Sequence, residues 1–381
     1  MPKTSRLATT LVTTTLVTTT VLLLALAASA QAGVGGVTAS VTDTVQRGAA
    51  GSSALSFDPT KLSRDPLITV RCETYVDADA DGLDDGVENC ALNDHAPVAY
   101  LPLGLDWTRP ANVDWYLQRS ALRFHHNNCS DDQIVALAGL TQTRLVNQYH
   151  RRKHGVASLH PCSHYGDLIG SGSSSSYDDD QHYFLQPNDA THAGSANPAD
   201  WIVYGHVYPN DIGGMNVQYW FFYAYNDNIA SFNHEGDWES ITVRLDPRGN
   251  PSGVYVCAHA HCELRSDITW HTRRHPTVWV ADGSHASYST EVGCDRNGYS
   301  EGAGDNCQTV DAYRWFTWRG GRGSQLGQQG GGVINVGEKD RPLNGQKFIR
   351  YYAKWGENGT SDVTSGPRTP TFQASWNVGA P

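Results

Sequence analysis

Several segments of the chain have the pattern of β-strands: they are rich in β-branched and aromatic residues, and glycine, proline or Asn/Asp clusters separate many of them. These segments are residues 201–208, 217–225, 238–245, 253–259, 277–281 and 348–355. Many strands with few helices favour an all-β fold. We therefore expect an antiparallel β-sandwich with a few helices and long loops.

One segment has a helical pattern instead. Leucine, isoleucine and valine recur there at roughly the helical period, from Ser130, which can cap the first turn, to about Tyr149. Two further segments, residues 165–181 and 320–332, are dominated by small and polar residues or by glycine, which is typical of surface loops.

The first residues have the form of a signal peptide. Lys3 and Arg6 give a positive start, an apolar run follows, and small residues precede a cleavage point near Ala32. A membrane anchor is the weaker alternative, because threonines dilute the run. We therefore expect a signal peptide over 1–32 and a flexible lead-in over 33–70. The mature protein would be secreted or extracytoplasmic, with no transmembrane segment.

Composition restricts the partners and the redox state. The 381-residue chain has a net charge of -11, which argues against nucleic acid as a partner. Its 8 cysteines all follow the signal peptide, and an even number in an oxidising compartment predicts disulfides. Proximity along the chain favours the pairs Cys72–Cys90, Cys129–Cys162, Cys257–Cys262 and Cys294–Cys307. Metal binding by cysteine is a weaker alternative, since no Cys-x-x-Cys occurs.

Residues 77–88 match the twelve-position calcium loop D-x-[DN]-x-[DN]-G-x5-E without a gap. The expected ligands are Asp77, Asp79, Asp81, the carbonyl of Leu83, Asp85 through water, and Glu88. Gly82 allows the sharp turn, and Cys72 and Cys90 bracket the loop. The flanks are unlike paired EF-hand helices, and the loop resembles the Asp-rich calcium repeats of thrombospondin type 3. We predict a Ca²⁺-binding module over 71–92, the alternative being an acidic loop without an ion.

A second polar cluster, His234-Glu235-Gly236-Asp237-Trp238-Glu239, follows an aromatic segment. On a strand, Asp237 and Glu239 would share one face with Ile241. Two carboxylates so close repel each other unless a cation or a proton compensates them. The expected ligands of a divalent cation are Asp227, His234, Asp237 and Glu239, a set that suits Mg²⁺, Mn²⁺ or Ca²⁺. The alternative is a sandwich corner where these side chains bond backbone groups.

Further histidines extend the candidate chemistry. His259 and His261 would share one face of a strand, as acid–base or metal-binding groups, or would belong to a turn closed by a Cys257–Cys262 bond. His285 lies in a Gly-Ser-His motif. A zincin protease and a G-x-S-x-G hydrolase are disfavoured, because neither motif is complete.

An ordered series of motifs identifies a family resemblance. They are Ala96-Pro97-Val98-Ala99-Tyr100, Pro110-Ala111-Asn112-Val113-Asp114-Trp115-Tyr116-Leu117, the aromatic strand, His234-x-Gly236-Asp237-Trp238-Glu239, and His275-Pro276-Thr277-Val278-Trp279-Val280 leading into Gly283-Ser284-His285-Ala286-Ser287-Tyr288. In this order they resemble the vacuolar protein sorting-associated protein 62 family. We therefore expect one domain of that kind, the β-sandwich, over residues 93–381.

The central motif is also similar to the His-x-x-Asp-Trp-Glu core of the necrosis- and ethylene-inducing-like cytolysins. That resemblance implies a β-sandwich that engages membrane sphingolipids, with a divalent cation held by His234, Asp237, Glu239 and Asp227. The sequence departs from the cytolysin motif at Gly236, where that family has a second histidine, and at Glu235, where it has arginine. This departure puts cytolytic activity in doubt.

Three functions stay open. The first is a calcium-stabilised exported protein that binds a surface ligand, a glycan or a lipid headgroup, through the second cation. Abundant Trp and Tyr suit such contacts. The second is a metal-assisted hydrolase with Glu239 or His285 as the general base. The third is a structural or interaction module without catalysis.

Overall fold

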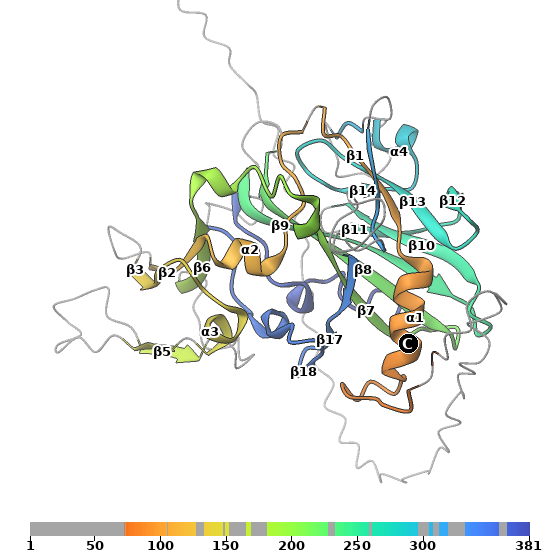
Figure 1. Ribbon diagram of the computed structural model, residues 1–381, viewed down its shortest axis with the longest axis horizontal. Coiled ribbons are helices and arrows are strands. Elements are labelled where there is room, and N and C mark those ends of the chain that lie inside the picture. Colours follow the sequence, from red (N-terminus) through yellow and green to blue (C-terminus); the bar gives the residue numbers. More distant parts are fainter. Residues whose placement is uncertain are drawn as a thin grey trace, which may run out of the picture. The chain divides into compact units, whose positions relative to one another are not determined.

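The computed structural model describes residues 72, 74–104, 106–126, 133–147, 149–151, 165–168, 181–227, 233–258, 261–295, 305–307, 312–318, 332–357 and 364–381. The predicted signal peptide and lead-in, the Cys129–Cys162 pair and His259 lie outside these residues. Within them, strands in several antiparallel and mixed sheets dominate and helices are few, as the sequence predicts (Figure 1).

The largest described sheet has the strand order β11-β10-β9-β8-β7-β16. Its strands are β7 (Ile202–Pro209), β8 (Met215–Asn226), β9 (His234–Leu245), β10 (Pro251–Ala258), β11 (His261–Arg265) and β16 (Gly332–Asn335). Neighbours pair antiparallel except β16, which runs parallel to β7. The strands predicted over 201–208, 217–225 and 238–245 are therefore confirmed, and the one over 253–259 is confirmed to residue 258.

A second sheet has the order β12-β13-β1-β15, with β14 paired to β13. Its strands are β1 (Val98–Leu101), β12 (Trp270–His271), β13 (His275–Val280), β14 (Ser287–Tyr288) and β15 (Tyr313–Phe316). Strand β1 runs parallel to β13, which confirms the strand predicted near 277–281. Both sheets contribute to one hydrophobic core, which includes Val217, Tyr219, Ile241 and Val243 from the larger sheet and Ala99, Val278 and Trp315 from the second.

Helix α1 (Asp85–His95) belongs to the same core. Its side chains Val87 and Leu92 are buried, and the helix lies beside β7 and β8 (Figure 1). A Cβ at Gly205 of β7 would collide with Leu92, so glycine there lets the helix approach the strand. The boundary predicted between 92 and 93 falls inside this helix.

The other face of the large sheet carries a second, aromatic core. Trp220, Phe222 and Trp238 pack there with Tyr116 and Trp355. The elements around it are α2 (Val113–Leu117), α3 (Gln142–Val146), β2 (Ser120–His126), β3 (Gln133–Ala136), β6 (Gln181–Pro187) and the 3-10 helix η5 (Lys347–Arg350). The remaining elements are β4 (Tyr149–Arg151), β5 (Tyr165–Leu168), β17 (Gly337–Glu338), β18 (Arg341–Pro342), α4 (Glu291–Asp295), η2 (Asp189–Thr191), η3 (Pro198–Asp200) and η7 (Pro370–Phe372).

The helix predicted from residue 130 to about 149 is wrong over most of its length. Residues 133–136 form β3 against β2, and among the described residues of this segment only Gln142–Val146 is helical. Gly139 takes a positive φ of 92°, which interrupts a helix, and the Thr141 side chain caps the short helix that follows. The apolar residues Ile134 and Leu137 are exposed instead of forming a buried stripe.

The strand predicted over 348–355 is also wrong. The segment begins in η5 and continues as irregular chain, with an isolated bridge at Lys354. Its apolar residues, among them Phe348, Tyr351 and Trp355, are buried against the aromatic face of the large sheet. Burial therefore explains the composition without strand pairing. Likewise, the loop predicted over 165–181 includes β5 at its start.

Among the described residues, the structure confirms three predicted disulfides: Cys72–Cys90, Cys257–Cys262 and Cys294–Cys307. Disulfides form and persist in oxidising surroundings. In the described part of the chain, no helix has the length and apolarity needed to cross a membrane.

Candidate functional site

The loop over residues 77–88 brings its acidic side chains together. Single oxygens of Asp77, Asp79 and Asp85 lie within 4.8 Å of one another, and so do those of Asp79, Asp81 and Glu88. The glycine at the sixth position of the loop has a φ of 95°, as a sharp turn requires. Carboxylate oxygens at this spacing can coordinate one hard cation.

Two of these carboxylates, those of Asp79 and Glu88, are buried. Asp79 is 4% exposed and Glu88 is 1% exposed. Asp79 Oδ1, Asp81 Oδ2 and Glu88 Oε1 are buried and have no hydrogen-bond partner. Burial, followed by repulsion from neighbouring carboxylates, raises the pKa of Asp79 to about 7 and that of Glu88 to about 9. Such a site is costly unless a cation or protons enter it.

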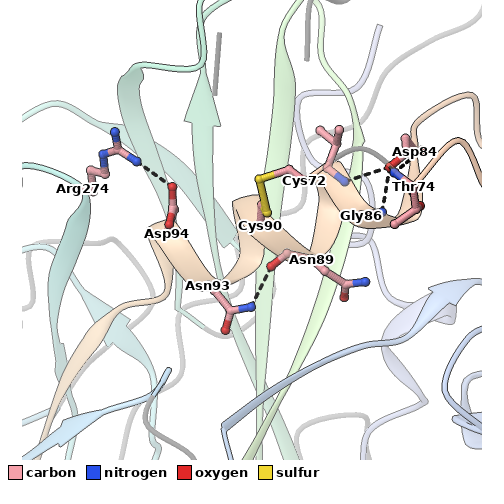
Figure 2. Close-up of a disulfide and its surroundings, with 10 residues drawn as sticks. Cys72, Thr74, Asp84, Gly86, Asn89, Cys90, Asn93, Asp94 and Arg274 are labelled. Atoms are coloured by element: carbon pink, nitrogen blue, oxygen red, sulfur yellow. Dashed lines mark hydrogen bonds and ion pairs between the residues drawn. A yellow bond between two sulfur atoms is a disulfide. The ribbon is translucent and has the colours of Figure 1, made fainter. Parts of the chain in front are cut away.

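Asp84 holds the loop in shape although it is no predicted ligand. Its carboxylate accepts hydrogen bonds from the backbone of Gly86 and Val87 and so caps α1. It also accepts bonds from the backbone N–H groups of Thr74 and Val76, at 2.9 and 3.1 Å. Asp84 therefore ties the chain entering the loop to the helix leaving it (Figure 2).

Two further links anchor α1. The Cys72–Cys90 bond joins the helix to the chain before the loop, and Asp94 accepts from Arg274 Nη1 at 2.6 Å (Figure 2). On the loop side, Asn335 Nδ2 of β16 donates to Glu88 Oε2 at 2.8 Å. The predicted ligand Glu88 is thus connected directly to the large sheet.

A cleft of about 510 Å³ opens beside the loop. Asp79 and Asp81 form part of its wall, and Glu338, Lys339 and Asp340 form another part. Two of the predicted ligands, Asp79 and Asp81, therefore line a cleft.

The second predicted cluster lies at the start of β9. Asp237 and Glu239 are both buried and share the face of Ile241, as predicted from strand alternation. Asp237 Oδ2 lies 2.8 Å from His285 Nδ1, and Asp106 Oδ2 lies 3.0 Å from His285 Nε2. The imidazole therefore lies between two carboxylates.

His285 is the buried cation of this region. It is 1% exposed and stacks on Tyr223, with ring centroids 3.9 Å apart. Burial alone lowers the pKa of His285, but Asp106 and Asp237 outweigh it and raise that pKa to about 9. Burial, then the neighbouring Asp237, raise the pKa of Glu239 well above its ordinary value.

The other predicted ligands of the second cation have other partners. His234 Nδ1 lies 2.8 Å from the carbonyl oxygen of Gly236. Asp227 accepts from Trp107 Nε1 at 2.7 Å and from Asn233 Nδ2 at 3.1 Å. Among the described residues, the groups whose ligand atoms lie close enough to share one ion are those of the loop over residues 77–88. A cation at Asp227, His234, Asp237 and Glu239 stays a prediction.

The departure from the cytolysin motif at Gly236 has a structural reason. Gly236 has a φ of 62°, and a Cβ there would collide with the backbone carbonyl of Trp355. Because that Cβ would lie 2.4 Å from the Trp355 carbonyl oxygen, histidine does not fit this position.

Sequence reasoning missed Asp106, although it noted its partner His285. Asp106 lies in the chain after β1, outside any recognisable motif, and the fold alone brings it to His285. His261 is exposed on β11, and the pairing of Cys257 with Cys262 beside it agrees with the structural alternative for that segment.

Comparisons of this chain with family models, curated proteins and solved structures find no match.

Proposed function

We propose that the protein is an exported, calcium-stabilised β-sandwich that works as a binding protein rather than as an enzyme. The main support comes from the calcium loop, where Asp79 and Glu88 bury oxygen atoms that have no hydrogen-bond partner. A divalent cation compensates both the charge and the missing bonds.

The ligand set favours Ca²⁺ over Mg²⁺. The loop offers up to five carboxylates and a backbone carbonyl within twelve residues. Calcium accepts six to eight oxygens in flexible geometry, whereas magnesium needs an almost ideal octahedron and keeps several waters. Extracellular calcium is sufficient to fill even weak sites of this type.

The ion would act on the stability of the whole domain. Glu88 is on the first turn of α1, and its second oxygen accepts from Asn335 of β16. Helix α1 in turn buries Leu92 against Gly205. Closing the loop around an ion therefore fixes the end of a helix that is part of the main core.

Export and the sandwich arrangement belong to the same proposal. The signal-like residues 1–32 and the three described disulfides support an oxidising destination. The shared core of the two sheets supports a sandwich. The sandwich arrangement agrees with the resemblance to the vacuolar protein sorting-associated protein 62 family, which stays a hypothesis.

A hydrolytic role has less support. Both ring nitrogens of His285 face carboxylates, and the residue is 1% exposed, so a substrate has no access to it as a general base. Glu239 is also buried, with 5% exposed. The second cation is not part of the proposal, because Asp237 already faces the His285 imidazole.

Calorimetric titration of the chelator-treated protein with CaCl₂ tests the calcium site. We expect saturable binding by the wild type and a loss of at least about tenfold in affinity for Asp79→Asn, because one charged ligand is removed. Asp340→Asn is the matched control, since Asp340 is an exposed carboxylate on the same cleft but outside the ligand groups.

Equal weakening by both substitutions would mean that only the general negative charge matters. Absence of calcium binding in the wild type would overturn the proposal.

A further inference from the structure

An exposed indole lies near the junction of β8 and β9. Trp107 is 43% exposed, yet its ring is held in place. Its Nε1 donates to Asp227 Oδ2 at 2.7 Å, and its ring centroid lies 5.9 Å from that of Tyr225. Single exposed hydrophobic residues are common on protein surfaces. Trp107 differs from such residues, because the hydrogen bond of its N–H to the protein fixes the orientation of the indole before any ligand arrives.

Further polar side chains contact the two partners of this ring, Asp227 and Tyr225. Asn233 Nδ2 donates to the other oxygen of Asp227. Tyr225 stacks on His192, with ring centroids 4.3 Å apart, and His192 Nε2 lies 3.5 Å from Glu235 Oε1. Tyr225 and Glu235 are register partners across β8 and β9. The two strands thus hold an aromatic surface and its hydrogen-bonding groups together.

Asp227 has hydrogen-bonding capacity left for a ligand. An ionised carboxylate has about four acceptor positions, and the side-chain N–H groups of Trp107 and Asn233 use two of them. Neighbouring hydroxyl groups can donate to the rest, while a flat C–H surface packs on the indole. A pyranose ring offers both features on one molecule.

The local charge selects against an anionic ligand. Asp227 and Glu235 belong to the cluster. Burial first, then Asp106 and also Asp227, raise the pKa of Asp282, so the Asp282 carboxylate lies near the cluster as well. The positive charge near these carboxylates is that of Arg109, whose Nη1 donates to the Trp107 carbonyl at 2.7 Å. A phosphate headgroup or a uronic acid would be repelled, whereas a neutral sugar would not.

We infer that Trp107, Asp227 and Asn233 form a binding site for a neutral pyranose sugar, with Tyr225 and Glu235 at its edge. This inference rests on the proposed binding role and names its ligand class. It does not require the second cation.

The test titrates cellohexaose, maltohexaose, xylohexaose, mannohexaose and chitohexaose into the full chain in saturating CaCl₂, followed by tryptophan fluorescence and calorimetry. We expect at least one oligosaccharide to bind and to change the fluorescence. Trp107→Ala should weaken that binding by at least about tenfold, and Trp107→Phe should lose less, because an aromatic face is kept. Tyr75→Ala is the matched control, since Tyr75 is a 90% exposed aromatic outside the cluster.

Circular dichroism and the unfolding midpoint show whether each variant is folded. Binding by none of the five sugars, or equal binding by the wild type and Trp107→Ala, would overturn the inference. Trp107-dependent binding to phosphatidylserine vesicles instead of sugars would also overturn it. If the same samples still bind calcium, only this inference fails; loss of calcium binding would remove the proposed function as well.

Discussion

Two regions of this protein bury carboxylates, and they compensate them differently. At the start of β9, the His285 imidazole lies between Asp237 and Asp106. In the calcium loop, Asn335 meets one oxygen of Glu88, while another Glu88 oxygen and one of Asp79 have no partner. A cluster of acidic residues therefore indicates a metal site only where no cationic side chain of the protein already compensates the carboxylates.

Replacement of His285 should have the largest effect, because it removes the internal cation. His285→Asn leaves Asp106 and Asp237 buried without a positive partner, and we expect unfolding in urea to show a loss of about 3–5 kcal/mol. Asparagine tolerates the positive φ of 55° at this position, so backbone strain does not explain the loss. His261→Asn, at an exposed histidine, should change stability by less than about 0.5 kcal/mol. Similar stability of the two variants would contradict the compensation by His285.

Calcium removal should have the next largest effect. With free calcium at about 100 times Kd, binding to the native state contributes about 2.7 kcal/mol, which a chelator should abolish. Urea unfolding with and without EGTA measures this difference. The ionic interaction of His285 is internal, so the destabilisation by His285→Asn should be the same in both buffers. If His285→Asn destabilised the protein only in EGTA, the two regions would be energetically coupled, which would contradict this prediction.

The sign of the stability change that a substitution causes, measured with and without calcium, distinguishes the two regions further. In calcium, Glu88→Gln should destabilise the protein, because a charged ligand is lost. In EGTA it should stabilise the protein by about 1 kcal/mol, because a buried, repelled carboxyl disappears. Asp237→Asn should destabilise in both buffers, since His285 loses a partner. A Glu88→Gln variant that is less stable in both buffers would contradict an ion-dependent loop.

The smallest effect concerns the second buried histidine, His95. Burial lowers its pKa from 6.5 to about 3, so the folded protein holds it neutral. Its contribution to stability is complete above pH 6.5 and is lost as pH falls towards 3, with less than about 1 kcal/mol lost by pH 6. His285, with a raised pKa of about 9, has the opposite dependence: its contribution is complete below 6.5 and is lost as pH rises through 9.

Unfolding free energies of the wild type and His95→Gln between pH 8 and 6, in saturating calcium, measure the His95 contribution as a difference. Identical slopes for the two proteins would contradict it.

Sequence reasoning succeeded where the information is local. The loop over residues 77–88 has all its predicted ligands within twelve residues, and the structure brings their carboxylates together, while calcium itself stays a prediction. The strands of the large sheet were predictable from the run of aromatic and β-branched residues in β8 and β9. Alternation along β9 also placed Asp237 and Glu239 correctly on the core face.

It failed where distant residues or tertiary packing decide. Asp106 is near His285 only because the chain after β1 crosses the turn that follows β13. The region after residue 130 has a helical spacing of apolar residues, but Gly139 and pairing with β2 prevent the helix. Phe348 and Trp355 are apolar because they cover Trp238, and no local pattern distinguishes such a cover from a strand.

The Cys72–Cys90 bond has a consequence for maturation. It closes a covalent ring that contains every predicted calcium ligand, from Asp77 to Glu88. Once the ring exists, the ligands stay near one another even in the unfolded chain. The conformational entropy that is lost when the ligands come together is therefore lost on oxidation rather than on metal binding. We expect oxidation to come first and calcium second, and a reduced chain to capture the ion only after the core has formed.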